Sequence, residues 1–238
     1  MARAQEVGRM IARNIAPVVV RMAPQAAGGM LRGVLEIAID GRGALPSAKA
    51  AAVRQLQRNG GSIDDAIESL IDSHVRLASA QGFVTNLGGV AALPITIPAN
   101  LAGISIVQIR MVAAIAHLRG YDLADNRVRT SLVMCLMGAD EVAKHISLGK
   151  FPTSPMAVAT APVFDPVLDR MVAEYVVADM AGRVSGKSMA HVFTKRIPII
   201  GGGIGAVIDA IATRNVGEYA KIELANRRSH RYPAPVSH

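Results

Sequence analysis

"LASAQGFVTNLGGVAALPITIPANLAGISIVQI", residues 77–109, holds 33 consecutive positions without an Asp, Glu, Lys or Arg. A helix of this length on the surface of a soluble protein normally carries charged residues along its outer face. Protein or lipid must therefore cover this segment. Five residues that soften or interrupt a helix divide it: Gly82, Gly88, Gly89, Pro94 and Pro98. We expect two apolar segments that form a helical hairpin.

Three arrangements of this segment fit the sequence. A straight transmembrane helix over 98–118 would place Arg110 near the bilayer centre, at a cost of about 2.5–3.5 kcal/mol on insertion scales, and is the least favoured. A hairpin that dips into one leaflet tolerates glycines and prolines at its apex, where protein or lipid head groups cover irregular backbone. A helix pair buried on all sides in a bundle needs no charge either. The last two arrangements remain open.

The rest of the chain carries helix signals and almost no strand signals. The signals are a capping box at Ser62 and Asp65, an N-cap at Asp122 after a stop at Gly120, and an N-cap with proline at Asp165 and Pro166 before a stop at Gly182. They predict an all-α fold, a single multi-helix bundle around the charge-free, Gly- and Pro-containing central hairpin. The predicted helices span 3–22, 28–39, 46–58, 63–81, 99–118, 123–137, 140–148, 166–181 and 203–226, with the main surface loop at 150–165.

Charge divides the chain into segments. Residues 1–58 carry nine Lys or Arg against three acids, and residues 183–238 again carry nine against three, whereas the middle is mildly acidic. We predict a basic N-terminal helical segment over 1–58, a helical domain over 59–228 and a disordered tail over 229–238. Basic ends suit an anionic membrane surface. The alternative is that they keep an unusually apolar chain soluble. Scattered aromatics and the absence of zinc spacings argue against nucleic acid as a partner.

The location of the protein follows from the start of the chain and from its cysteine content. The most apolar N-terminal stretch, 15–20, is interrupted by Pro17 and ended by Arg21, so it is too short for a secretory signal. A single cysteine, Cys135, forms no internal disulfide and lies in an apolar run typical of a buried, inert thiol. We therefore expect a cytoplasmic protein at the inner face of the cell membrane.

A glycine cluster near the C-terminus resembles a nucleotide-binding fingerprint. Gly201, Gly203 and Ala206 match G-x-G-x-x-A. That fingerprint needs a parallel strand before the glycines and another after the helix. Pro198 interrupts the only candidate strand, and a helix and a tail follow, so no nucleotide site is supported. Residues 182–188 fail the P-loop pattern for similar reasons, because only three residues separate the two glycines.

Close helix packing explains the same glycines better. Small residues four apart let two helices approach backbone to backbone in an apolar setting. We expect the C-terminal glycines to meet the segment 88–103. The candidates for helix packing or membrane contact are Gly82, Gly88, Gly89, Pro94, Pro98, Gly201, Gly202, Gly203 and Gly205. Asp209 would then be a lone carboxylate among apolar groups, needing a cation such as Arg110 or Lys195, or else a raised pKa. We predict that Arg110 and Asp209 form a buried ion pair.

No catalytic, metal or cofactor residues are predicted. The six histidines lack metal-ligand spacings, and the spacing of Glu141 and His145 predicts a local side-chain contact on one helix face. No Gly-x-Ser-x-Gly elbow is present.

Two blocks of sequence resemble a known family. "ASAQGFVTNLGGVAALPITIPANLAGISIVQIRMVAAIAHLRGYD" (78–122) and "KRIPIIGGGIGAVIDAIATRNVGEYA" (195–220) are similar, in order and spacing, to the EcsC family of bacterial proteins. The resemblance covers about residues 63–225 and leaves most of 1–58 outside it. One member of that family is encoded beside the parts of an ABC transporter. The resemblance implies a helical domain, a membrane neighbourhood and a transport-related partner, and it implies no catalytic residues.

The sequence therefore predicts a non-enzymatic, peripheral membrane protein. The first alternative is a soluble helical bundle that binds a lipid or other apolar ligand. The weaker alternative is an enzyme of unidentified reaction whose carboxylates or histidines converge only in the fold.

Overall fold

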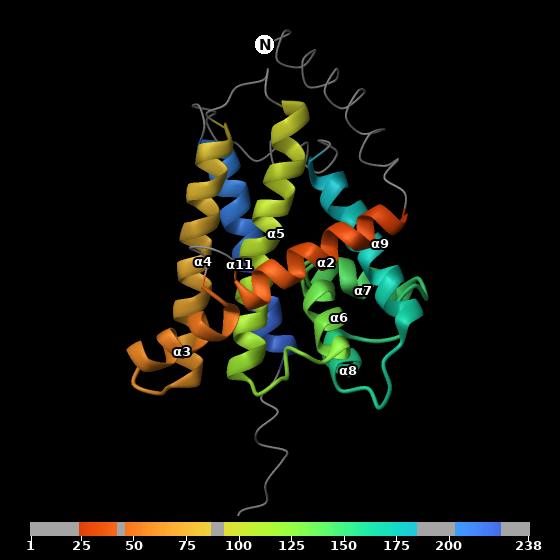
Figure 1. The fold of residues 1–238 in the computed structure, drawn as a ribbon, viewed down its shortest axis with the longest axis horizontal. Helices are drawn as coiled ribbons and strands as arrows, with labels where there is room; N and C mark the ends of the chain where they lie inside the picture. The colour runs from red at the N-terminus through yellow and green to blue at the C-terminus, as the bar shows by residue number, and fades with distance from the viewer. Residues whose placement is uncertain (1–23, 42–45, 87–92, 185–202, 225–238) are drawn as a thin grey trace, which may run out of the picture.

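The computed structural model of the chain describes residues 24–41, 46–86, 93–184 and 203–224. These residues form helices and contain no strand, which confirms the predicted all-α bundle (Figure 1). The helices of this described part are α2 (Pro24–Asp40), α3 (Ala48–Arg58), α4 (Ile63–Asn86), α5 (Leu93–Leu118), α6 (Asn126–Cys135), α7 (Ala139–Ser147), α8 (Pro155–Ala159), α9 (Pro166–Val184) and α11 (Gly203–Glu223).

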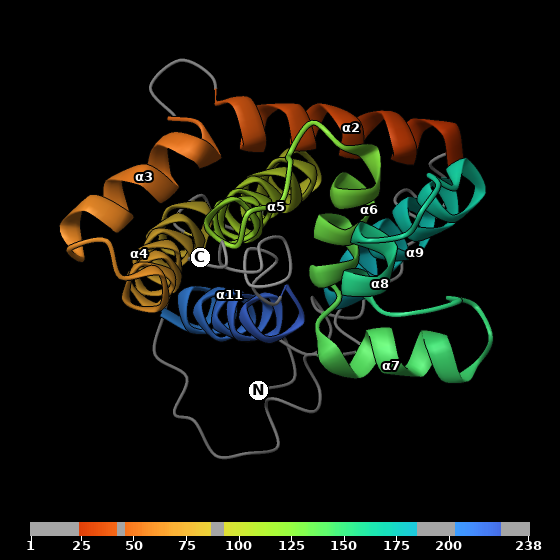
Figure 2. The ribbon, with the colours of Figure 1, turned by 90° about the horizontal axis from the view of Figure 1, so that it is seen from below.

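Helix α5 lies at the centre of the bundle. Seen from below, α2, α3, α4, α6 and α11 surround it (Figure 2), and it contacts each of them and α9. Residues 107–116 are buried in succession, so this part of α5 has no solvent-exposed face. A helix surrounded by other helices can be apolar all round. This explains why the second half of the charge-free segment, around residues 104–109, carries no charged side chain.

Helices α4 and α11 are antiparallel neighbours with an extensive contact (Figure 1). Arg214 of α11 pairs with Asp72 of α4 at 2.5 Å, and Lys221 pairs with Glu68. Between these ion pairs the helices approach closely at Gly217. A Cβ atom there would lie 2.9 Å from Cγ1 of Ile71, so only glycine fits without a shift of its neighbours.

The basic N-terminal segment contributes to the same core. Leu31, Val34 and Ala38 of α2 and Ala52 of α3 are buried, and both helices pack against α5. Packing therefore runs across residue 58, the boundary between the first two predicted segments. The predicted helix 3–22 and the predicted tail 229–238 lie outside the described residues.

Several predicted boundaries are corrected. The N-cap of α6 is Asp125, which accepts a hydrogen bond from the Arg127 amide at 2.9 Å, and not Asp122. The Asp122 carboxylate instead accepts from the Ala124 amide at 3.0 Å and closes a turn before the helix. Helix α9 continues two residues past its predicted stop at Gly182.

Prolines lie inside helices at two places where the sequence predicted irregular backbone: the loop 150–165 and the hairpin. Pro155 starts the short helix α8 inside that loop, since proline suits the first helical position. Helix α5 begins at Leu93 and runs through Pro94 and Pro98. Pro94 lies in the first turn, where a missing N–H removes no intrahelical bond, so these prolines do not separate two elements.

Candidate functional site

One end of the bundle carries no charged residue on three adjacent helices. The end of α4 (77–86), the first part of α5 (93–109) and the start of α11 (203–208) contain no Asp, Glu, Lys or Arg. All three segments lie together at the upper end of the bundle in Figure 1. We call them the uncharged end. Segments distant in sequence are thus gathered at one pole of the molecule.

A common boundary limits the uncharged end. The first charged residues below it are Arg76 on α4, Arg110 on α5 and Asp209 on α11. The Gln108–Thr213 hydrogen bond and the Asp72–Arg214 ion pair fix the register of the three helices. At about 1.5 Å per residue, this register places the three boundary residues within about 9 Å of one another along the bundle axis.

Apolar side chains are exposed to solvent at this boundary. Leu77 is 41% exposed on α4, and Val207 and Ile211 are 49% and 53% exposed on α11. The register of α4 and α11 puts Leu77 at the level between the other two. Farther from the uncharged end, two ion pairs join the same helices: Asp72 pairs with Arg214, and Glu68 pairs with Lys221. The outer surface of α4 and α11 therefore changes from charged to apolar toward the uncharged end.

Asp209 is half-buried at this boundary, and burial raises the pKa of its carboxyl from 3.8 to about 6. The predicted ion pair with Arg110 is not formed: no salt bridge joins these two described side chains. The register explains this. Because Gln108 lies opposite Thr213, Asp209 lies level with about residue 104 of α5, roughly 9 Å above Arg110 along the axis.

Arg110 lies instead near Arg54 of α3 and His74 of α4, close enough for their charges to interact. Its side chain is 8% exposed, and its Nε atom is buried without a hydrogen-bond partner in the described part of the chain. Burial lowers its pKa, and the nearby charge of Arg54 on α3 lowers it further. His74 of α4 is buried beside it, with its Nε2 atom also unpartnered among the described residues.

The glycines predicted to pack helices fall partly outside the described residues. Gly82 lies in α4, and Gly203 and Gly205 lie in the first turn of α11, with no side-chain environment described around them. Gly88, Gly89, Gly201 and Gly202 lie outside the described residues. The close approach that the structure shows is at Gly217, which the sequence analysis missed. An isolated glycine in a helical pattern was the available signal.

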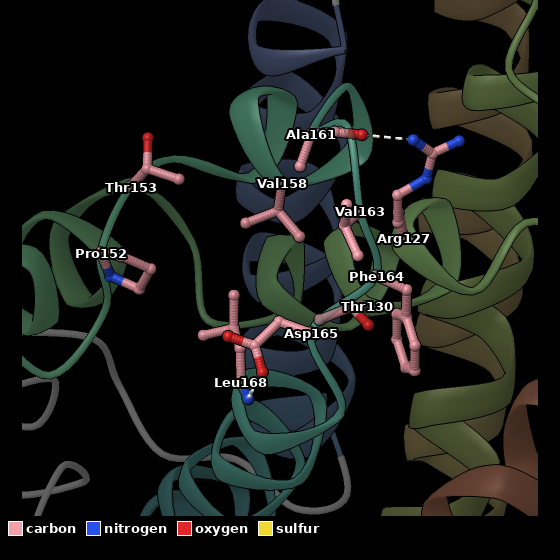
Figure 3. A pocket seen from close by; sticks show the side chains of 10 residues that line it. All are labelled: Arg127, Thr130, Pro152, Thr153, Val158, Ala161, Val163, Phe164, Asp165 and Leu168. Carbon is pink, nitrogen blue, oxygen red and sulfur yellow. Dashed lines mark hydrogen bonds between the residues drawn. The ribbon is translucent and has the colours of Figure 1, made fainter.

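A cavity of about 180 Å³ lies between α6, α8 and the start of α9 (Figure 3). Its walls are mostly apolar, and its polar groups are already engaged. The Arg127 guanidinium donates to Asp125 and to the Ala161 carbonyl, the Thr130 hydroxyl donates to Asp169 at 2.6 Å, and Asp165 caps α9. Ligand sites usually occupy about 300–1,000 Å³. This cavity is therefore too small for the lipid that the alternative hypothesis requires.

His145 packs as a structural side chain near the end of α7. Its ring centroid lies 5.0 Å from that of Phe151 and 4.7 Å from that of Tyr175. Its Nδ1 lies 2.9 Å from the carbonyl oxygen of Glu141, while the Glu141 carboxylate pairs with Lys144. His145 therefore contacts the backbone of Glu141 and not its carboxylate, which corrects the predicted side-chain contact. In the described ranges, no group of three or more potential ligands could hold a metal.

Cys135 is fully buried, and burial raises the pKa of its thiol well above the usual range. This confirms the prediction of a buried, inert thiol.

Among the helices that the structure describes, none combines the length and the apolar character that a membrane crossing requires. No family model, curated protein or solved structure matches the chain. The similarity of residues 78–122 and 195–220 to the EcsC family stays a prediction.

Proposed function

We propose that the protein is a peripheral membrane protein without enzymatic activity, and that the uncharged end enters one leaflet of an anionic membrane. The observation that carries this proposal is the gathering of three charge-free helix segments at one pole, with Leu77, Val207 and Ile211 exposed at its edge. Exposed apolar residues that cluster rather than scatter are typical of an interaction surface.

The dimensions of the uncharged end suit one leaflet. Residues 77–86 of α4 span about 15 Å at 1.5 Å per residue, which is half of a hydrocarbon core about 30 Å thick. Arg76, exposed on α4 directly below this segment, would then lie at the level of the lipid head groups. Such a geometry anchors the bundle in one leaflet without a crossing.

Charge supports an anionic membrane as the partner. The chain has a formal net charge of +8, concentrated in its two ends. A basic residue near an anionic membrane surface contributes about 1 kcal/mol to attraction. We infer that the protein sits at the inner face of the cytoplasmic membrane. The similarity to the EcsC family makes a transporter in that membrane a candidate partner.

Co-sedimentation with vesicles tests the proposal. Vesicles of phosphatidylcholine and phosphatidylglycerol in equal parts should bind the protein at low salt, and pure phosphatidylcholine vesicles should bind it more weakly. Leu77→Asp and Val207→Asp should each reduce binding roughly tenfold, because full burial of a Val or Leu side chain contributes about 1.5 kcal/mol or more. Both side chains are already exposed, so the fold should tolerate the changes.

Ile222→Asp is the matched control. Ile222 lies on the same helix, α11, and is 75% exposed, but it is at the opposite end of the bundle. Its replacement should leave vesicle binding unchanged. Equal weakening by all three variants would contradict the proposed surface. Protein that stays in the supernatant at low salt, with anionic lipid present, would contradict membrane association itself.

A further inference from the structure

Two arginines and a histidine from three helices lie near one another below the uncharged end, since the charge of Arg54 acts on Arg110 and that of Arg110 acts on His74. Arg110 comes from α5, His74 from α4 and Arg54 from α3, and these helices pack against one another. Arg54 is exposed, whereas Arg110 and His74 are 8% and 4% exposed. Arg54 is therefore the outer cation, and we call the buried Arg110 and His74 the inner pair.

The inner pair has unused hydrogen-bonding atoms. Arg110 Nε and His74 Nε2 are both buried without a partner in the described part of the chain. Buried polar atoms are nearly always hydrogen-bonded, and an exception calls for an explanation such as an unseen ion. Two such atoms on neighbouring helices indicate one shared ligand more readily than two separate defects.

The charged groups that act on Arg110 and His74 are both cations. Arg54 is the charged group that acts on Arg110, and Arg110 is the one that acts on His74. A buried cation without a counter-charge is costly. Arg119, one residue past the end of α5, shows the usual solution: its Nε atom is also without a partner, but its guanidinium pairs with Asp64 at 3.0 Å. No described carboxylate plays that part for Arg110.

We infer that Arg110, His74 and Arg54 form a binding site for a phosphate group between α3, α4 and α5. Arg110 donates to the phosphate oxygens from the inner side, and Arg54 closes the outer side. The ligand is a phosphate ion or the phosphate of a lipid head group, since the site lies next to the boundary of the uncharged end. The site does not depend on the proposed membrane contact.

The protonation of His74 should depend on whether this site holds a phosphate. Its Nδ1 donates to the Leu70 carbonyl at 2.8 Å, so the neutral ring leaves Nε2 as an acceptor. The pKa of His74 is lowered from 6.5 to about 4, mainly by burial. The hydrogen bond to Leu70 raises this pKa, and the charge of Arg110 lowers it. A phosphate beside Nε2 would offset the Arg110 charge and stabilise the imidazolium. Phosphate binding should therefore raise the pKa of His74.

Nuclear magnetic resonance of the His74 ring in the full chain tests this inference. Titration with inorganic phosphate at constant ionic strength should raise the pKa of His74 by at least one unit, and chloride should not. Arg110→Gln should abolish the response, and Arg54→Gln, an exposed position that leaves the core intact, should weaken phosphate affinity several-fold. Arg119→Gln, the control one residue past the end of α5, should keep wild-type affinity.

The source of the phosphate is resolved by a second probe. Dihexanoyl phosphatidic acid, below its micelle concentration, should act at lower concentration than inorganic phosphate if the site takes a lipid head group, and equal concentrations would assign it to a free phosphate. Both results support the site. A His74 pKa that does not respond to either probe, or an equal response in Arg54→Gln and wild-type protein, would overturn it.

Discussion

Gln108 of α5 donates a hydrogen bond to the hydroxyl of Thr213 of α11, with 3.3 Å between Nε2 and Oγ1 and both side chains buried. This contact joins residues 105 positions apart and sets the two helices in register. It also separates Asp209 from Arg110 along the bundle axis. The buried amide and hydroxyl thus decide which charged groups can meet at the edge of the uncharged end.

Thr213→Val should destabilise the protein by about 1–3 kcal/mol, because it keeps the side-chain shape but leaves the buried Gln108 amide without its partner. Urea unfolding followed by circular dichroism measures this. Thr160→Val is the control, since Thr160 is exposed on the cap of α8, and it should change stability by less than about 0.5 kcal/mol. The double variant Gln108→Leu with Thr213→Val should recover much of the loss. A double variant less stable than Thr213→Val alone would contradict this reading of the contact.

Gly217→Ala should destabilise the protein by about 1–2 kcal/mol. The added Cβ would lie 2.9 Å from Cγ1 of Ile71 and 3.1 Å from Cε of Met111. The Met111 methyl can move, but Ile71 is β-branched, fully buried and stiff at χ1. Overpacking of about 1–3 kcal/mol therefore exceeds the roughly 0.5–1 kcal/mol that alanine gains over glycine in a helix.

Gly33→Ala gives the matched comparison for Gly217. Gly33 lies inside α2, and a Cβ there would meet no atom within 4 Å. The same substitution should therefore stabilise the protein by about 0.5–1 kcal/mol. Opposite signs in thermal unfolding would establish the close approach of α4, α5 and α11. Stabilisation by both variants would show that α11 does not pack tightly at Gly217.

Local signals were enough to predict most helices. Ser62 accepts a hydrogen bond from the Asp65 amide, Gly120 has the positive φ of a helix stop, and Asp165 caps α9. Each of these caps and stops depends on residues only a few positions apart, so it can be predicted from the local sequence. Asp122 was misassigned because Asp125, three residues later, offers the same cap chemistry at the true start of α6.

Contacts between distant helices could not be predicted in the same way. The ion pair of Arg110 and Asp209 was predicted from opposite charge alone, without the register that Gln108 and Thr213 impose. The charge gap over 77–109 did predict an unusual environment. It could not show that α11 brings a second charge-free segment to the same end, because that depends on how α4 and α11 pair.

Asp209→Asn should stabilise the protein near neutral pH and lose this advantage in acid. Burial raises the pKa of Asp209 from 3.8 to about 6. The protonated carboxyl is thus favoured in the folded state, so the corresponding stability is fully present below pH 3.8 and is lost as the pH rises through about 6. The amide of asparagine mimics the protonated form at every pH.

After a discount for the partial exposure of Asp209, the gain in Asp209→Asn should be about 1 kcal/mol near pH 7.5. Urea unfolding between about pH 4 and pH 8 measures the difference from wild type, which should shrink toward zero at the acid end. Glu36→Gln, at an exposed position on α2, makes the same change in net charge, and its effect is subtracted. If the stability difference between variant and wild type stayed constant across this range, the Asp209 carboxylate would be fully solvated. That result would contradict its half-buried position at the edge of the apolar surface.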